Sequence, residues 1–318
     1  MNQPDPGGAE SEPASDARAS VCAVLVTYHP EPAALRRATA AVRPQVDAIV
    51  VVDNASPEIN ASPEIDVDGV VLLRQPTNVG LAAAQNIGIG WARDNGHTHV
   101  LILDQDSVPA PGMVPELLSA WRELATTARV AAVGPRFHDP RENRDAPFVK
   151  VAFPMSHKLW CDAANRHVPC DFLISSGALI PLAVLADVGD MDAGLFIDNV
   201  DLEWSFRARA RGYALFGVCG ALMEHRLGDD RRALPGGRQQ VVHGPVRLYY
   251  IMRNRLTLYR LPHTPRVWIA QDLPRVLAKF LIFAVLVAPR RRNVRYMLRG
   301  LVDGLRGRSG PCPLGAQR

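Results

Sequence analysis

The chain has 318 residues, of which 47% are hydrophobic and 21% are charged, so it can bury a large core and is neither a disordered nor a fibrous protein. Its net charge of +4 is small, which excludes the strongly basic and strongly acidic classes, although the basic residues concentrate toward the C-terminus. The five cysteines are scattered without a Cys-x-x-Cys pair, which disfavours a zinc site and predicts free thiols in a reducing compartment.

The N-terminal residues 1–19 are rich in proline, glycine, alanine, serine and acidic residues, which predicts a disordered tail. They contain no apolar segment that could act as a signal peptide, so we expect the protein to reside in the cytoplasm. A folded domain is expected over residues 20–228, and a C-terminal loop and helical region over residues 229–318.

Short apolar runs alternate with helical patterns through the first half of the chain. Strands are predicted at 21–27, 48–52, 69–73, 100–103 and 130–134, and helices at 31–42, from about 80 to about 94, and around 114–125. Residues 136–145 lack periodicity and predict a loop, whereas 172–180 predict a strand and a turn. Strands that alternate with helices of this length predict an α/β fold with a mostly parallel sheet.

Polar side chains follow three of the predicted strands at the point where each strand ends. They are Thr27 and Tyr28, then Asp53 and Asn54, and then Asp104, Gln105 and Asp106. In open parallel sheets, ligands bind beyond the carboxyl ends of the strands, so these side chains are expected to line one crevice. Asp104 and Asp106 are two residues apart and can converge on one Mg²⁺ or Mn²⁺ ion. An isolated Asp-x-Asp is more often a solvated turn, but the shared position of the three strand ends favours a binding site.

Two other classes of nucleotide-binding protein are excluded. The sequence contains no G-x-x-x-x-G-K-[ST] motif, so it is not a P-loop protein. Tyr28, His29 and Pro30 stand after the first strand, where a dinucleotide-binding Rossmann domain needs G-x-G-x-x-G.

Four segments taken in order resemble family 2 glycosyltransferases of the GT-A fold: VLVTYHP at 24–30, VVDNAS at 51–56, NVGLAAAQN at 78–86 and DQD at 104–106. The resemblance covers roughly residues 20–260. Two further segments, FIDNVDLEW at 196–204 and HRLG at 225–228, resemble more narrowly the bacterial rhamnosyltransferase branch, which uses dTDP-rhamnose.

The resemblance implies roles for individual residues. Donor binding is assigned to Thr27, Tyr28, Asp53, Asn54, Gly80, Asn86, Asp104, Gln105 and Arg253. The metal ligands implied are Asp104, Asp106 and His225, which would hold Mg²⁺ or Mn²⁺ at the sugar diphosphate. Outside this resemblance, a lone histidine is more often a structural residue, and Ser175, Ser176 and Gly177 are explained about equally well by a plain turn.

The general base of the reaction is expected among the acidic residues near 200. A helix is predicted from Asn199 onward, with Asp198 as its N-cap. Many family members carry Glu-Asp where this chain has Asp198 and Asn199, and an amide cannot accept the proton of the acceptor hydroxyl. We therefore expect Asp198 to be the base, with Asp201 as the second candidate, while Glu203 is expected only to complement the helix dipole.

The C-terminal region combines an apolar stretch with basic residues. Residues 229–238 predict a charged loop, and 243–255 resemble the family's Tyr-Tyr-x-x-Arg-Asn segment. The apolar peak at 280–288 is too short to span a bilayer, which needs about 20 residues. With the arginines at 290–295 it predicts an interfacial segment at the inner face of the plasma membrane, and a dimer interface or a buried helix hairpin is the alternative. One short basic run without a binding motif predicts no nucleic-acid partner.

These observations predict an inverting, metal-dependent glycosyltransferase that moves rhamnose from dTDP-rhamnose to a lipid-linked or polysaccharide acceptor in cell-envelope glycan synthesis. UDP-galactofuranose or UDP-GlcNAc are alternative donors. A catalytically degenerate protein that only binds a nucleotide or a partner is the alternative from another class. A homo-oligomer is compatible with all of these.

Overall fold

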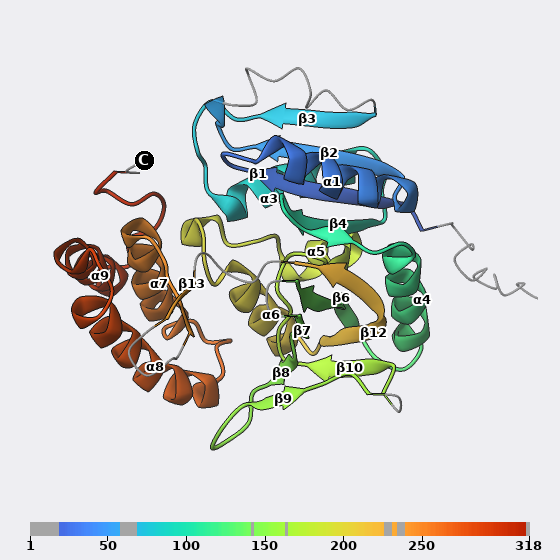
Figure 1. Ribbon diagram of the computed structural model, residues 1–318. Helices are drawn as coiled ribbons and strands as arrows, with labels where there is room; N and C mark the ends of the chain where they lie inside the picture. Colours follow the sequence, from blue (N-terminus) through green and yellow to red (C-terminus); the bar gives the residue numbers. More distant parts are fainter. Residues whose placement is uncertain are drawn as a thin grey trace, which may run out of the picture.

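The computed structural model describes residues 19–57, 69–140, 143–162, 165–225, 231–233 and 239–315 (Figure 1). The predicted disordered tail lies outside the described residues except for its last position. Most of the predicted loop at 229–238 also lies outside them, although its residues Arg231–Ala233 form strand β13, which pairs with β14 (Gln239–Val241).

A ten-stranded sheet forms the centre of the molecule, with β10-β12-β6-β11-β4-β1-β2-β3 as the main order, β5 beside β12 and β7 beside β6 (Figure 1). Its strands are β1 (Val21–Thr27), β2 (Ala48–Asp53), β3 (Val70–Arg74), β4 (His99–Asp104), β5 (Val108–Pro109), β6 (Val130–Asp139), β7 (Arg144–Asp145), β10 (His167–Cys170), β11 (Leu179–Pro181) and β12 (Ala214–Glu224). A separate hairpin pairs β8 (Phe148–Lys150) with β9 (His157–Leu159).

The four strands β3, β2, β1 and β4 are parallel, as the alternating pattern predicts. In this register Thr27 lies opposite Asp53, and Val26 lies opposite Asp104. The polar strand ends therefore meet at one edge of the sheet, and the predicted α/β fold is confirmed.

Apolar residues of the central strands alternate between two buried layers. On β1, Val24 belongs to the layer that contains Ala82 of α3 (Leu81–Asp94), whereas Leu25 belongs to the layer that contains Leu35 of α1 (Pro32–Val42). Both faces of these strands are covered, which is why their sequences are continuously apolar rather than alternating. Three further helices flank the sheet: α4 (Met113–Ala125), α5 (Leu182–Val188) and α6 (Val200–Ala210).

One local prediction is wrong, and another is correct only in part. The predicted loop at 136–145 contains the end of β6 and all of β7, because β6 continues beside the long strand β12 and then turns back on itself through the His138–Asp145 and Asp139–Arg144 pairs. The strand predicted within 172–180 is the short β11, which runs antiparallel to β4 and β6. The pairing of β11 depends on strands that are distant in the chain, whereas β7 pairs with the strand just before it.

Three C-terminal helices form a separate bundle beside the sheet domain: α7 (Pro245–Leu258), α8 (Arg266–Val285) and α9 (Arg290–Leu305) (Figure 1). Leu248 and Met252 of α7 pack with Phe283 and Met297 in the centre of the bundle. None of the helices in the described part of the chain is sufficiently long and apolar to cross a membrane.

The expectation of five free thiols is wrong. Cys161 and Cys219 form a disulfide across 58 residues of sequence, whereas Cys22, Cys170 and Cys312 are free and buried. Cys219 lies on β12, and the segment that carries Cys161 leads into β10, the antiparallel neighbour of β12. The sheet therefore brings together two cysteines that show no pairing pattern in the sequence.

Candidate active site

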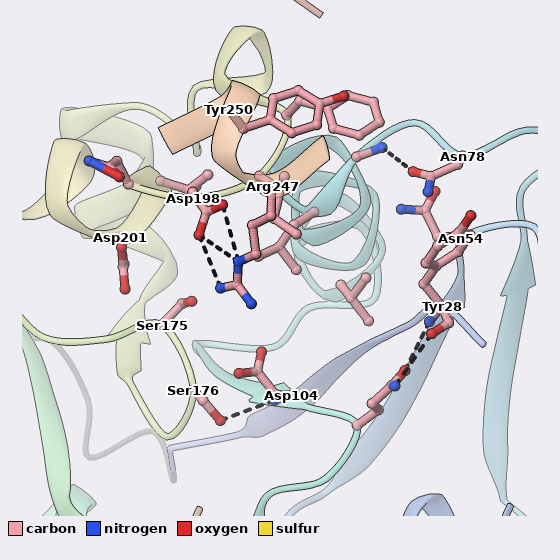
Figure 2. A pocket seen from close by; sticks show the side chains of 18 of the residues that line it. Tyr28, Asn54, Asn78, Asp104, Ser175, Ser176, Asp198, Asp201, Arg247 and Tyr250 are labelled. Atoms are coloured by element: carbon pink, nitrogen blue, oxygen red, sulfur yellow. Dashed lines mark hydrogen bonds and ion pairs between the residues drawn. The ribbon is translucent and has the colours of Figure 1, made fainter. Parts of the chain in front are cut away.

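A cleft of about 840 Å³ opens beyond the carboxyl ends of β1, β2 and β4. The sheet supplies Tyr28, Asn54 and Asp104 to its wall, and α7 supplies Arg247 and Tyr250 from the other side (Figure 2). Most of the remaining lining residues come from three segments: 78–81 at the start of α3, 174–176 in the loop before β11, and 196–201 at the start of α6. The cleft thus lies where the parallel sheet predicts a ligand site.

Asp104, Asp106 and His225 converge in this cleft. One potential ligand atom from each of them lies within 4.8 Å of the others. The Nε2 atom of His225 is 3.9 Å from Oδ2 of Asp104, and its Nδ1 atom is 4.0 Å from Oδ1 of Asp106. Two carboxylates and an imidazole suit Mn²⁺ or Mg²⁺, so the three side chains could hold such an ion.

The hydroxyl groups of Ser176 and Ser107 connect Asp104 to His225 through hydrogen bonds. The backbone N–H of Asp104 donates to Oγ of Ser176, which hydrogen-bonds Oγ of Ser107 at 2.7 Å. Ser107 in turn contacts Nδ1 of His225 at 2.8 Å, so Nε2 is the ring nitrogen left to face Asp104. Partners of this kind orient a metal-binding histidine. Burial in the cleft raises the pKa of Asp104, with the charge of His225 opposing and that of Asp106 adding to the rise. A bound cation would offset this cost of ionisation.

Side chains at the ends of β1 and β2 form the opposite part of the wall. The backbone N–H of Tyr28 donates to Oε1 of Gln105 at 2.9 Å, which links β1 to the Asp-x-Asp turn. Asn54 accepts from the backbone N–H of Val79 at 2.7 Å. Gly80 follows with a φ of +89°, and a Cβ atom there would meet the ring of Phe196 at 2.7 Å. The donor-binding predictions for Tyr28, Asn54, Gly80, Asp104 and Gln105 thus fall on residues that line the cleft.

Four other residues that were predicted to bind the donor do not line the cleft: Thr27, Asp53, Asn86 and Arg253. Thr27 donates to Oδ1 of Asp53 at 3.0 Å, and both side chains are buried at the strand ends that they brace. The side chain of Asn86 donates to the carbonyl oxygen of Met191 and accepts from its backbone N–H.

Arg253, which was predicted to bind the donor, instead binds the protein backbone. Its guanidinium is buried and donates to the backbone carbonyls of Gly194, Leu195 and Gly310. It therefore fastens the loop before α6 and the C-terminal segment to α7, and it is not aimed at the cleft.

Arg247 is the cationic side chain that the sequence interpretation missed. It lines the cleft and forms an ion pair with Asp198 at 3.0 Å (Figure 2). Helical spacing alone could not reveal it, because Arg247 and Arg253 each lie three residues from Tyr250 on α7. The hydrogen bonds of Arg253 to the loop carbonyls show which of the two arginines faces the cleft. The ring of Tyr250 stacks on Phe196, with centroids 5.0 Å apart.

The two candidate bases have different surroundings. Asp198 accepts from Nε of Arg247 through both of its carboxylate oxygens, at 3.0 and 3.2 Å. It is not the N-cap of α6 as predicted, because Asn199 occupies that position with a φ of 64° and no capping side-chain bond. Both carboxylate oxygens of Asp198 are therefore engaged by the guanidinium of Arg247.

Asp201 lies in the first turn of α6 and also lines the cleft (Figure 2). Burial raises its pKa to about 6, with the charges of Asp104 and Asp198 adding to the rise and backbone N–H groups opposing it. A carboxylate with such a pKa can accept a proton near neutral pH, which is what a general base needs. Glu203, in contrast, is buried and pairs with Arg207 at 2.9 Å.

Comparison with known proteins agrees with this geometry. The family profile described as "Glycosyl transferase family 2" matches residues 23–178, which contain the strand ends, the Asp-x-Asp turn and the serines behind it. The chain is also 29% identical over 295 residues to the dTDP-rhamnosyl transferase RfbF of Shigella flexneri, covering 92% of this chain and 97% of that protein. Residues 23–178 of the chain are a family 2 glycosyltransferase domain. The family predicted from the sequence motifs is therefore confirmed.

Solved structures show that this glycosyltransferase has the GT-A fold. S. aureus TarS in complex with UDP-GlcNAc matches with a TM-score of 0.56 and 13% identity, covering 90% of this chain and 81% of that one. GalNAc-T7 with UDP, GalNAc and Mn²⁺ matches with a TM-score of 0.55 and 14% identity, covering 85% of this chain. The glycosyltransferase spans 57% of the GalNAc-T7 chain. At these identities the matches show the fold alone.

Proposed function

We propose that this glycosyltransferase moves rhamnose from dTDP-rhamnose to a lipid-linked or polysaccharide acceptor in cell-envelope glycan synthesis. The observation that carries the proposal is the similarity to dTDP-rhamnosyl transferase RfbF, which extends over 92% of this chain and so includes the C-terminal bundle as well as the sheet domain. The acceptor side of the cleft is built from α7 of that bundle, so the similarity covers both walls of the site.

The sheet side of the cleft would bind the donor. Tyr28, Asn54 and Gly80 line the part next to β1 and β2, where the nucleoside would lie. Asp104, Asp106 and His225 would hold Mg²⁺ or Mn²⁺, and the bound ion would neutralise the charge that develops on the departing nucleoside diphosphate. Arg247 is the cleft arginine that could also approach the diphosphate, in place of the predicted Arg253.

The proposed reaction inverts the anomeric carbon. The acceptor hydroxyl attacks from the face opposite the leaving dTDP, and Asp201 accepts the proton of that hydroxyl. A single displacement of this kind needs one base in the cleft and no covalent sugar–enzyme intermediate. Asp198 then has the separate task of holding Arg247 in place.

The protein would work at the inner face of the plasma membrane, where a lipid-linked acceptor is presented to a cytoplasmic enzyme. The proposal includes peripheral attachment, and it leaves room for a homo-oligomer.

The first test of the proposal compares two amide variants in an assay that measures dTDP release from dTDP-rhamnose in the presence of envelope lipid extract. Asp201→Asn should bind donor normally and lose at least about 100-fold in kcat, as expected for loss of a general base. Asp198→Asn is the matched variant, since it also removes one carboxylate from the cleft but should change KM for the donor more than kcat. Full activity of Asp201→Asn would refute its role as the base.

A further inference from the structure

Leu273, Leu277, Leu281 and Val285 recur at every fourth position along α8 and form an uncharged stripe on its outer face. They are 51%, 61%, 53% and 59% exposed, respectively. The opposite face of the same helix is buried in the bundle through residues such as Phe283. The α8 stripe, as we define it by these four residues, is therefore a second apolar face that no other described residue covers.

A loop from the sheet domain carries two further exposed apolar side chains near the start of α8. Phe153 and Met155, between β8 and β9, are 79% and 72% exposed. Gln271 of α8 holds this loop in place through hydrogen bonds with the carbonyls of Ala152 and Pro154 and the hydroxyl of Ser156. Gln271 lies in the second turn of α8, so the loop lies near the N-terminal end of this helix, and Figure 1 shows the β8–β9 hairpin beside that end of α8.

Basic residues adjoin the other end of the stripe. Arg290, Arg291 and Arg295 are exposed in the first turns of α9, just after α8 ends. The two acidic residues between positions 266 and 306, Asp272 and Asp303, are both buried and paired with arginines. The apolar face therefore carries positive charge at its edge and no exposed negative charge within this segment.

We propose that the α8 stripe, Phe153 and Met155 dock into the surface of a lipid bilayer with anionic headgroups, with α8 lying in the plane of the membrane and the α9 arginines contacting lipid phosphates. An apolar helix face bordered by arginines is the arrangement that binds such surfaces. A symmetric dimer through the same patch would place two clusters of like charge at one interface, which disfavours a second copy as the occupant.

The position of α7 connects this surface to the cleft. Arg247 and Tyr250 of α7 line the cleft, whereas Leu248 and Met252 pack toward α8 and α9. Packed helix axes lie about 8–10 Å apart, so the docked face would be about two helix layers from the site. A lipid-linked acceptor could span that distance, and in this respect the inference rests on the proposed function.

The inference is tested by sedimenting the full-length protein with vesicles of phosphatidylcholine, with and without phosphatidylglycerol. We expect binding only to the anionic vesicles. The double variant Leu277→Ser with Leu281→Ser should lower the affinity by about 100-fold, since each exposed leucine that enters lipid contributes about tenfold. Arg290→Ser, Arg291→Ser and Arg295→Ser together should also lower it by about 100-fold. The matched control is Arg37→Ser, Arg74→Ser and Arg122→Ser, which removes the same charge from exposed positions in the sheet domain and should change nothing.

A second measurement locates the hairpin loop. Phe153→Trp should show stronger quenching of its fluorescence by brominated anionic lipid than the wild-type protein does. Equal binding by the leucine variant would overturn the proposal, as would a failure of the wild type to sediment with anionic vesicles. If the wild type is instead a dimer that the leucine variant dissociates, the face is a protein interface. The vesicle assay contains neither donor nor acceptor, so its failure leaves the proposed reaction untouched, and a failure of the reaction leaves docking testable.

Discussion

Asp198 lies just before α6 and Asp201 lies in its first turn. The two aspartates have different electrostatic surroundings. Both carboxylate oxygens of Asp198 bind Arg247, whereas Asp201 lies partly buried near the negative charges of Asp104 and Asp198. Asp198 therefore positions the guanidinium of Arg247, and Asp201 has a pKa that suits a general base. This contrast, rather than their order in the sequence, decides which one we assign as the base.

The raised pKa of Asp201 predicts a pH-dependent effect on stability. An aspartate has a pKa of about 3.9 in the unfolded chain, and the folded value is about 6, so ionising Asp201 costs folding free energy as the pH rises between these values. Asp201→Asn cannot ionise and keeps the shape of the side chain. With EDTA present, its thermal midpoint should exceed that of the wild type at pH 8 and converge with it near pH 4.

Thermal unfolding of both proteins across this pH range checks the prediction. A shift of the same size at both ends would mean that the substitution acts through packing and not through the charge. The same pKa predicts that transfer activity falls as the pH drops below about 6, because the base becomes protonated.

At the residue level, sequence identified the cluster of Asp104, Asp106 and His225 as candidates, because the first two follow a strand and the third completes a motif. It placed Asp198 ahead of Asp201 as the base, which is the reverse of the present proposal, and it did not find Arg247. The partner of Asp198 lies 49 residues away, and no local pattern shows such a pair.

At the level of elements, α9 approaches α7 closely at two glycines. A Cβ atom at Gly300 would meet the carbonyl oxygen of Tyr249 at 2.3 Å, and one at Gly304 would meet the carbonyl oxygen of Arg253 at 2.8 Å. The helices therefore approach until their backbones nearly touch. This fixes α7, which carries one wall of the cleft.

A pair of glycine variants tests this packing. Gly300→Ala should lower stability by about 1–3 kcal/mol, as overpacking does, because backbone atoms cannot move aside easily. Gly90→Ala, in the middle of α3 with no atom near the added Cβ, should instead raise stability by about 0.5–1 kcal/mol. Urea unfolding of both variants measures the difference. Equal effects of the two substitutions would show that the α7–α9 contact is looser than described.

The disulfide gives a second prediction at this level. When the purified protein is denatured and alkylated without a reducing agent, three cysteines should react, and all five should react after reduction. Closing a loop of this length stabilises a protein by about 4 kcal/mol in the chain-entropy account, so replacing both Cys161 and Cys219 by serine should lower the thermal midpoint of the oxidised protein. Five reactive thiols before reduction would instead support the original expectation.

The central parallel strands were predictable because each is a continuous apolar run covered on both faces, and Val21–Thr27 matches its predicted bounds. The short strand β11 was not, since its pairing comes from β4 and β6, which are distant in the chain. The strand β7 has two residues, which is too short for a periodic pattern. The three C-terminal helices follow apolar patterns in the sequence, but which face of α8 stays exposed became evident only from the packing.

For the whole molecule, the sheet domain and the C-terminal bundle each supply one wall of the cleft. The sheet brings the Asp-x-Asp turn and the nucleoside side of the site, and α7 brings Arg247 and Tyr250 (Figure 2). The outer face of the bundle is the surface that we propose for the membrane. Under the proposed function, the donor site and the route of the acceptor would therefore lie on opposite sides of α7.

The most direct test of the account is calorimetric binding of dTDP-rhamnose, UDP-GlcNAc and UDP-galactofuranose to the purified protein, with and without Mn²⁺. We predict that dTDP-rhamnose binds most tightly, that Mn²⁺ strengthens its binding, and that Asp104→Asn with Asp106→Asn removes the Mn²⁺ effect. Tighter binding of a UDP-sugar would contradict the proposed donor. Binding of dTDP-rhamnose that is indifferent to Mn²⁺ would contradict the metal site, and binding of none of the three by the folded protein would contradict the account as a whole.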